Sequence, residues 1–117
     1  MCETQKVERS KQMNSQFKRG IVELCVMKLL SARRMSTFEV LQIISKDLDV
    51  NENTVYPILR RLSNDNLLAI EKSNEGMGAP RKYYYLTELG ASRLVSLEQQ
   101  WNGFITNVSN ILGGNYE

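Results

Sequence analysis

The order of hydrophobic and polar positions predicts three helices in the first half of the chain. Residues 15–32 place apolar side chains on nearly every side of a helix, which predicts a helix that is buried all round. Residues 36–46 open with the spacing of a capping box, in which Ser36 and Glu39 satisfy each other's free backbone amides. After a short polar turn, residues 51–66 predict a third helix. Its cap is an asparagine, and a second asparagine stands where a left-handed glycine usually ends a helix.

After the third helix, the period of the pattern falls from 3.6 residues to about two. Residues 68–73 and 81–86 have the pattern of two strands, and the glycines and proline of residues 74–80 are typical of a hairpin loop. A last helix is predicted to start at Thr87. The expected fold class is therefore mainly α with a small β-hairpin (α+β). It comprises a winged helix-turn-helix and a long C-terminal dimerisation helix.

The last helix carries a stripe of apolar residues that are spaced alternately three and four positions apart. This spacing is a heptad seam, and it presents more apolar surface than a lone winged-helix domain can cover. A second copy of the chain is the simplest cover, so we predict a homodimer. In this dimer the first helix of one subunit packs on the last helix of the other. The predicted dimerisation residues are Phe17, Ile21, Leu94, Leu97, Trp101, Phe104, Val108 and Ile111.

These patterns divide the chain into three parts with different charge. The parts are a loose tail at residues 1–14, a winged-helix domain at residues 15–86, and a dimerisation helix with a short tail at residues 87–117. Residues 1–90 hold 14 Lys and Arg against 11 Asp and Glu, whereas residues 91–117 hold one basic and two acidic side chains. The net charge of +2 is too small to indicate nucleic-acid binding by itself. The asymmetry nevertheless favours an anionic partner at the front and a protein partner at the back.

Composition limits the class of protein further. A chain of 117 residues, of which 42% are hydrophobic, is long enough for one domain with a modest core. No apolar run reaches the ~18–20 residues of a membrane span, and no apolar secretory signal is present near the N-terminus. Cys2 and Cys25 have neither metal-ligand spacing nor a disulfide pattern. We therefore expect a cytoplasmic protein with no membrane partner.

The turn and the third helix have the layout of a helix-turn-helix, whose second helix places its N-terminal residues against base edges. Asparagine and arginine can bond adenine and guanine, threonine and proline can contact a thymine methyl group, and tyrosine can reach a phosphate. Basic residues on the hairpin can hold backbone phosphates. The predicted DNA-binding residues are Asn53, Thr54, Tyr56, Pro57, Arg60, Arg61, Lys72, Arg81 and Lys82. Each residue of the third helix taken singly fits a solvated side chain equally well, and basic residues on a hairpin are by themselves more often solvated. The cluster as a whole nevertheless favours DNA contact.

Catalysis has no support in the sequence. The chain has no histidine, no nucleophile motif and no glycine loop that leads into a helix to hold a phosphate. The two glycines at positions 76 and 78 belong to the tip of the predicted hairpin. We therefore predict that the protein is not an enzyme and that it has no cofactor and no metal site.

Two stretches of the sequence resemble the PadR-like family of winged-helix transcriptional repressors. They are residues 53–62, NTVYPILRRL, and residues 78–90, GAPRKYYYLTELG. The second is the more specific, being similar to the family's glycine-x-proline-arginine-lysine-tyrosine wing. The resemblance extends from about Phe17 to the C-terminus, and the single last helix looks like the subfamily with a minimal dimerisation tail. It implies a dimeric repressor that, in some members, is released from DNA by a small aromatic compound. Glu39 departs from the family, where a glycine is common.

Trp101 has two interpretations. Its place in the heptad seam is typical of a dimer core. In the multidrug-sensing branch of the family that the sequence resembles, a tryptophan at the matching place stacks planar ligands between the subunits. An effector site of that kind would be formed by Trp101, Phe104 and Val108. Both interpretations stay open.

The sequence thus predicts a sequence-specific DNA-binding transcriptional regulator, a repressor that acts as a homodimer on a pseudo-palindromic stretch of double-stranded DNA. The alternative is a protein-interaction module that uses the winged-helix surface without specific DNA binding. The two functions differ in their response to salt. Binding to DNA weakens steeply as salt rises, because counterions are released from each phosphate that is contacted.

Overall fold

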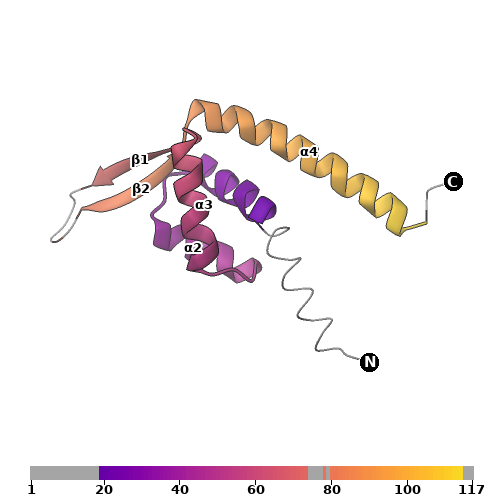
Figure 1. Ribbon diagram of the computed structural model, residues 1–117, viewed down its shortest axis with the longest axis horizontal. Coiled ribbons are helices and arrows are strands. Elements are labelled where there is room, and N and C mark those ends of the chain that lie inside the picture. Colours follow the sequence, from indigo (N-terminus) through magenta and orange to yellow (C-terminus); the bar gives the residue numbers. More distant parts are fainter. Residues whose placement is uncertain (1–18, 74–77, 79, 115–117) are drawn as a thin grey trace, which may run out of the picture.

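A computed structural model describes residues 19–73, 78 and 80–114, and it shows a winged-helix body from which one long helix extends (Figure 1). The elements are a first helix described over residues 19–32, α2 (Thr37–Asp47), α3 (Glu52–Asn64), β1 (Leu68–Ser73), β2 (Arg81–Leu86) and α4 (Glu88–Leu112). The predicted fold class is confirmed, and both strands have the predicted bounds. The predicted tail at residues 1–14 and Phe17 lie outside the described residues.

The ends of α2 and α3 follow from local side-chain chemistry. The Ser36 hydroxyl accepts a hydrogen bond from the Glu39 amide at 3.2 Å, and the Ser36 amide donates to the Glu39 carboxylate at 3.1 Å. The side chain of Asn51 accepts from the Asn53 amide at 2.9 Å. Asn66, after the end of α3, has a φ of 63°, the left-handed conformation that the sequence predicted. The capping predictions are therefore confirmed.

The antiparallel hairpin formed by β1 and β2, called the wing from here on, is attached to the body at its base. Its register runs from the pair Leu68–Leu86 to the pair Ser73–Arg81. Met35 precedes α2 and forms a bridge with Tyr84, through two backbone hydrogen bonds of 3.0 and 2.8 Å. These hydrogen bonds attach β2 of the wing to the segment that leads into α2.

One apolar core joins the helices to the base of the wing. The first helix contributes Val22, Val26, Met27 and Leu30, and α3 contributes the four residues predicted to face the core, Val55, Ile58, Leu59 and Leu62. The prediction that the first helix is buried all round is wrong for the single chain. Its remaining apolar side chains, Ile21, Leu24, Cys25 and Leu29, are only half-buried. They lie on sides of the helix that one subunit does not cover completely.

A compact hydrogen-bonded joint connects the end of α3 to the start of α4. The Thr87 hydroxyl donates to the carbonyl of Asn66 at 2.7 Å and accepts from the Gly90 amide at 3.0 Å. The Thr87 amide donates to the carbonyl of Leu67 at 3.1 Å. Gly90 is buried against this joint, and a Cβ atom there would lie 2.2 Å from the Leu67 carbonyl oxygen. The lack of a side chain at Gly90 therefore allows α4 to approach the end of α3.

Within the described residues, it is the first part of α4 that packs on the core of its own chain. Leu94 is buried in the core and Leu97 packs against it, while Lys28 of the first helix forms an ion pair with Glu98 at 3.1 Å. The remainder of the helix extends away from the body (Figure 1). Among the helices of the described residues, none is both long and apolar enough to cross a membrane.

Candidate nucleic-acid interface

The outer face of α3 presents most of the residues that the sequence assigned to DNA. Because Val55, Ile58, Leu59 and Leu62 face the core, the opposite side of the helix is turned to solvent. Asn53, Tyr56, Pro57 and Arg60 are exposed there, and Thr54 is half-buried. The side chains that can reach a base edge or a phosphate are thus accessible from the first to the third turn of α3.

Side chains alternate between the two faces of the wing along each strand, so its three basic residues do not all share one face. Lys72 and Lys82 are directly opposite each other in the register, and they share a face with the pair Ile70–Tyr84. Arg81 lies on the other face, because neighbouring residues of a strand point to opposite sides. All three basic side chains are exposed.

A groove of about 420 Å³ lies between α3 and the lysine-bearing face of the wing. It brings together three of the predicted DNA-binding residues, namely Tyr56, Arg60 and Lys82. The other residues that line it are Thr37, Leu59, Ser63, Asn64, Ile70 and Tyr84. Asn53, Thr54, Pro57, Lys72 and Arg81 are not among the lining residues. The predicted site is therefore partly a concave surface and partly the exposed surface around it.

Sequence reasoning missed several of the groove residues for different reasons. Ile70 and Tyr84 could have been found, because they alternate in the strands with the lysines that were singled out. Thr37 and Asn64 had no such signal, because only the packing of α2 and α3 against the wing brings them to the groove. The hydroxyl of Ser63 is buried and lacks a hydrogen-bond partner in the described part of the chain.

Arg61 makes an ion pair within the protein. Its guanidinium forms an ion pair with Glu23 of the first helix. This contact ties α3 to the first helix, and it occupies a side chain that the sequence assigned to DNA. We therefore leave Arg61 out of the interface that is developed below.

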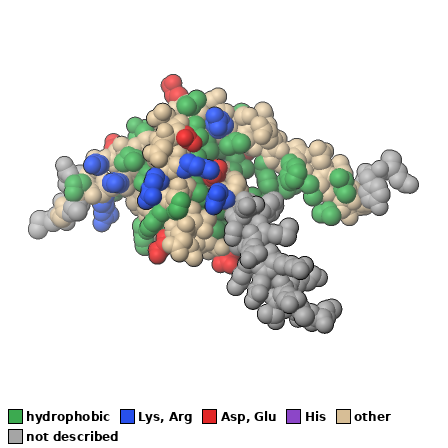
Figure 2. All heavy atoms as spheres, viewed as in Figure 1, with side chains coloured by type: hydrophobic (Ala, Val, Ile, Leu, Met, Phe, Trp, Pro, Cys, Tyr) green, Lys and Arg blue, Asp and Glu red, His purple; other side chains and the backbone are tan. Residues whose placement is uncertain are grey.

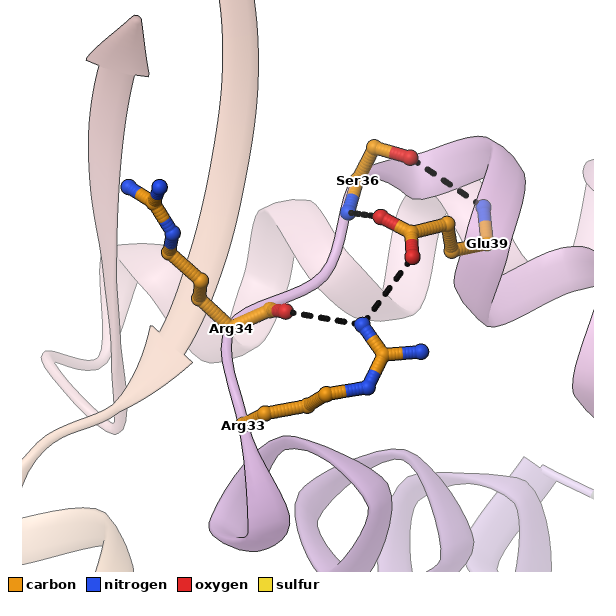
Figure 3. A network of polar contacts seen from close by, with 4 residues as sticks. All are labelled: Arg33, Arg34, Ser36 and Glu39. Atoms are coloured by element: carbon orange, nitrogen blue, oxygen red, sulfur yellow. Dashed lines mark hydrogen bonds and ion pairs between the residues drawn. The ribbon is translucent and has the colours of Figure 1, made fainter.

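The segment between the first helix and α2 holds two further arginines in place (Figure 3). The guanidinium of Arg33 donates to the carbonyl of Arg34 at 3.3 Å and to the carboxylate of Glu39 at 3.0 Å. The Arg34 guanidinium forms an ion pair with Glu71 of β1 and lies 4.8 Å from the centre of the Tyr83 ring. These contacts link the start of α2 to the face of the wing opposite the groove.

Glu39 is the carboxylate at the centre of this network. The hydrogen bond from the Ser36 backbone amide, followed by the one from Arg33, lowers the pKa of Glu39 below its ordinary value. A lowered pKa means that the ionised group stabilises the folded state at neutral pH, and that this contribution is lost as the pH falls through the lowered pKa. Glu39, where the resembled family commonly has glycine, therefore has a structural role at the start of α2.

Charge is distributed unevenly between the interface and the rest of the body. Lys28, Arg33, Arg34 and Arg61 each pair with a carboxylate. By contrast, no acidic residue in the described part of the chain pairs with any of the four interface cations, which are Arg60, Lys72, Arg81 and Lys82. Figure 2 shows Lys and Arg side chains gathered over the wing and the adjoining body. This surface is therefore suited to an anionic partner.

A second, apolar surface lies on the extended part of α4. Of the predicted seam, Trp101 and Val108 are half-buried, while Phe104 and Ile111 are 56% and 60% exposed. Ile105 and Leu112, which the sequence prediction did not include, are also exposed. Figure 2 shows hydrophobic side chains and no charged ones along the outer part of this helix. Among the described residues this is an extended apolar surface that is distinct from the basic one.

Comparison with known proteins matches this chain to one family of transcriptional regulators. Residues 26–96 match the sequence model of the transcriptional regulator PadR-like family. A PadR-like transcription factor from Bacteroides fragilis is 39% identical, with a TM-score of 0.73 over 86% of this chain and 98% of that one. A PadR family transcriptional regulator from Eggerthella lenta is 29% identical, with a TM-score of 0.79 over 92% of this chain and 95% of that one.

A more distant structure shares the fold. Bacillus subtilis PadR, which was solved in complex with operator DNA, is 19% identical to this chain. The TM-score is 0.59 over 65% of this chain and 46% of that one. At this identity the likeness is evidence of a common fold alone.

Proposed function

Because this chain belongs to the PadR-like family of transcriptional regulators, we propose that it represses transcription as a homodimer bound to a pseudo-palindromic operator. Family membership confirms the prediction that the protein is a regulator and not an enzyme. The observation that carries the proposal is the surface of α3 and the wing, where four cations lack an acidic partner among the described residues. A cytoplasmic location, where a regulator has access to the chromosome, stays part of the proposal.

The two elements of this surface have different tasks in the proposal. Asn53, which is exposed, and Thr54, which is half-buried, lie at the start of α3 and read base edges in the major groove. Lys72 and Arg81 of the wing contact backbone phosphates, which hold the protein in register without selecting a sequence. Bacillus subtilis PadR, a protein of the same fold, has been solved with operator DNA, which supports DNA as the proposed partner.

The apolar surface of α4 supports the homodimer. Phe104, Ile111 and Leu112 are more than half exposed in the single chain, although a contiguous apolar surface of this kind is unfavourable in water. A second copy covers it most simply, because the seam repeats in heptads and α4 carries no charged residue after Glu98. In this dimer, Ile21 and the other half-buried residues of the first helix pack on α4 of the partner subunit. Phe17 also belongs to the proposed interface.

DNA binding is tested by the salt dependence of the affinity. Fragments captured by the protein from its own genome are expected to share a pseudo-palindrome, with half-sites about one or two helical turns apart. With at most one phosphate contact for each of the eight interface cations of a dimer, the slope of log K against log salt is expected to be steep, with about −7 as its limit. Fluorescence anisotropy between 50 and 300 mM salt measures this slope. An affinity that barely responds to salt contradicts the proposal and favours the protein-interaction module instead.

An effector site at Trp101 is the finer part of the proposal. Trp101 is half-buried, it lies beyond the part of α4 that packs on its own core, and Phe104 and Val108 follow one and two turns later. In a dimer these side chains come from both subunits and form an apolar slot for a planar aromatic compound. Offset stacking adds about 0.5–1.5 kcal/mol per ring pair to the area that is buried.

The single tryptophan makes this site directly measurable. A planar cationic dye or a phenolic acid is expected to quench the emission of Trp101 saturably and to weaken operator binding by linkage. Trp101→Ala is expected to remove the quenching site, measured by dye fluorescence, while the variant stays dimeric in sedimentation. If Trp101→Ala dissociates the dimer, or if no compound of the panel quenches, the indole is dimer core only.

A further inference from the structure

We infer that the groove between α3 and the wing holds one phosphate of the DNA backbone, bound jointly by Arg60 of α3 and Lys82 of β2. This inference rests on the proposed DNA binding and deepens it. It assigns Arg60 to the backbone, whereas its position on a helix-turn-helix by itself favours a base edge. It also makes α3 and the wing partners on a single ligand group.

The chemistry of the groove selects an anion. Its lining contains two cations, Arg60 and Lys82, and no carboxylate. The hydroxyls of Thr37 and Tyr56 and the amide of Asn64 add hydrogen-bond donors to the same lining. A concave surface with several donors, two positive charges and no acid is complementary to a phosphate.

The apolar part of the lining strengthens this selection. Leu59 is buried in the floor, and Ile70 lies 44% exposed on the wing side. Charge interactions are stronger beside apolar groups, because less water screens them there. The volume of about 420 Å³ exceeds that of a phosphate group alone, which leaves room for an adjoining sugar.

The wing supplies an independent observation. Lys72 and Lys82 are directly opposite each other on the groove face, and like charges at paired positions of two strands destabilise a hairpin. A phosphate beside Lys82 offsets this repulsion. The opposite face of the wing differs, because there Glu71 is paired with Arg34. The uncompensated charge is thus placed on the side that faces α3.

The surroundings of the groove favour a DNA backbone over a free phosphate ion. Lys72 and Arg81 of the wing and Asn53 of α3 extend the polar surface beyond the groove. A free ion would contact the groove only, whereas a backbone also contacts these flanking residues. Both sources present the same phosphate chemistry, so the experiment below separates them.

Double-mutant cycles test whether the two cations share one phosphate. Arg60→Gln and Lys82→Gln are each expected to weaken binding but to lower the salt slope by less than about 0.9 per subunit, because the remaining cation still contacts the shared phosphate. The double variant is expected to lower the slope by about 0.9 per subunit, because only one phosphate contact is removed. Two separate phosphates would double the loss to about 1.8 per subunit.

Arg81→Gln provides the matched control. Arg81 is adjacent to Lys82 in the chain and lies on the other face of the wing. The substitution Arg81→Gln removes one positive charge, as Lys82→Gln does. Combined with Arg60→Gln, it is expected to be additive in both slope and affinity. A neutral methylphosphonate at one backbone position per half-site is expected to reduce the wild-type affinity and to abolish the effects of Arg60→Gln and Lys82→Gln together.

The possible results separate the shared phosphate from its alternatives. A slope loss of about 1.8 per subunit in the double variant, or a changed base preference in Arg60→Gln, overturns the inference and leaves the proposed DNA binding intact. Failure of the wild-type protein to bind DNA overturns both. If, in that case, inorganic phosphate saturably shifts the NMR signals of Thr37 and Lys82, the groove is a site for a free phosphate.

Discussion

Phe104→Asp is expected to convert the dimer into monomers and to abolish tight operator binding. Phe104 is 56% exposed in the single chain, so the substitution removes no core contact of its own subunit. Burial of a phenylalanine contributes about 1.5–3 kcal/mol, and the two-fold symmetry of the dimer doubles this to roughly 3–6 kcal/mol. The dimer dissociation constant is therefore expected to rise by about two to four orders of magnitude. Sedimentation velocity measures the change.

Gln99→Asp is the control for this substitution. Gln99 is exposed on the side of α4 away from the seam, and the variant introduces the same charge into the same helix. It is expected to remain dimeric and to bind DNA as the wild type does. Leu97→Asp is a poorer probe, because Leu97 also packs against the core of its own chain. A Phe104→Asp protein that stays dimeric at micromolar concentration contradicts the proposed interface.

Gly90→Ala is expected to destabilise the protein although alanine is the better helix former. The added Cβ would lie 2.2 Å from the Leu67 carbonyl oxygen and 2.7 Å from a methyl carbon of Leu86. A backbone carbonyl cannot rotate out of the way, so α4 has to shift or the joint with Thr87 has to open. Overpacking of this kind costs about 1–3 kcal/mol. We expect a net loss of roughly 2 kcal/mol in the free energy of unfolding, or about 8 °C in Tm.

The second glycine of α4 gives a control with the opposite sign. Gly103 has no atom within 4 Å of the position that a Cβ would take. Gly103→Ala is therefore expected to stabilise the helix by about 0.5–1 kcal/mol. Thermal unfolding at equal protein concentrations compares the two variants. If Gly90→Ala is as stable as the wild type, the close approach of α4 to the end of α3 does not constrain the fold.

The sequence was sufficient for features that depend on neighbours along the chain. A capping box needs only Ser36 and Glu39 at the right spacing, and a left-handed residue after α3 needs only an asparagine such as Asn66. The change of period from 3.6 to two placed both strands of the wing at their observed bounds. These features form through contacts within a few residues, which is why the pattern was enough.

Pairings between distant residues could not be read from the sequence. Arg61 has the same type and the same helix as Arg60, yet Arg61 pairs with Glu23 while Arg60 lines the groove. The period of α4 predicted one continuous seam, and only the structure separated the part that packs on its own core, at Leu94 and Leu97, from the exposed part beyond. Each outcome depends on which helix lies beside which residue.

What the sequence by itself determined was the set of elements, their caps, and the two surfaces, one basic and one apolar. These properties follow from side-chain periodicity and charge, which are local quantities. Only the tertiary structure decided that Tyr56, Arg60 and Lys82 line one groove together with Thr37. The reason is physical: α2, α3 and the wing are brought together by burial of a shared apolar core, and the positions of outward-facing polar side chains follow from that packing.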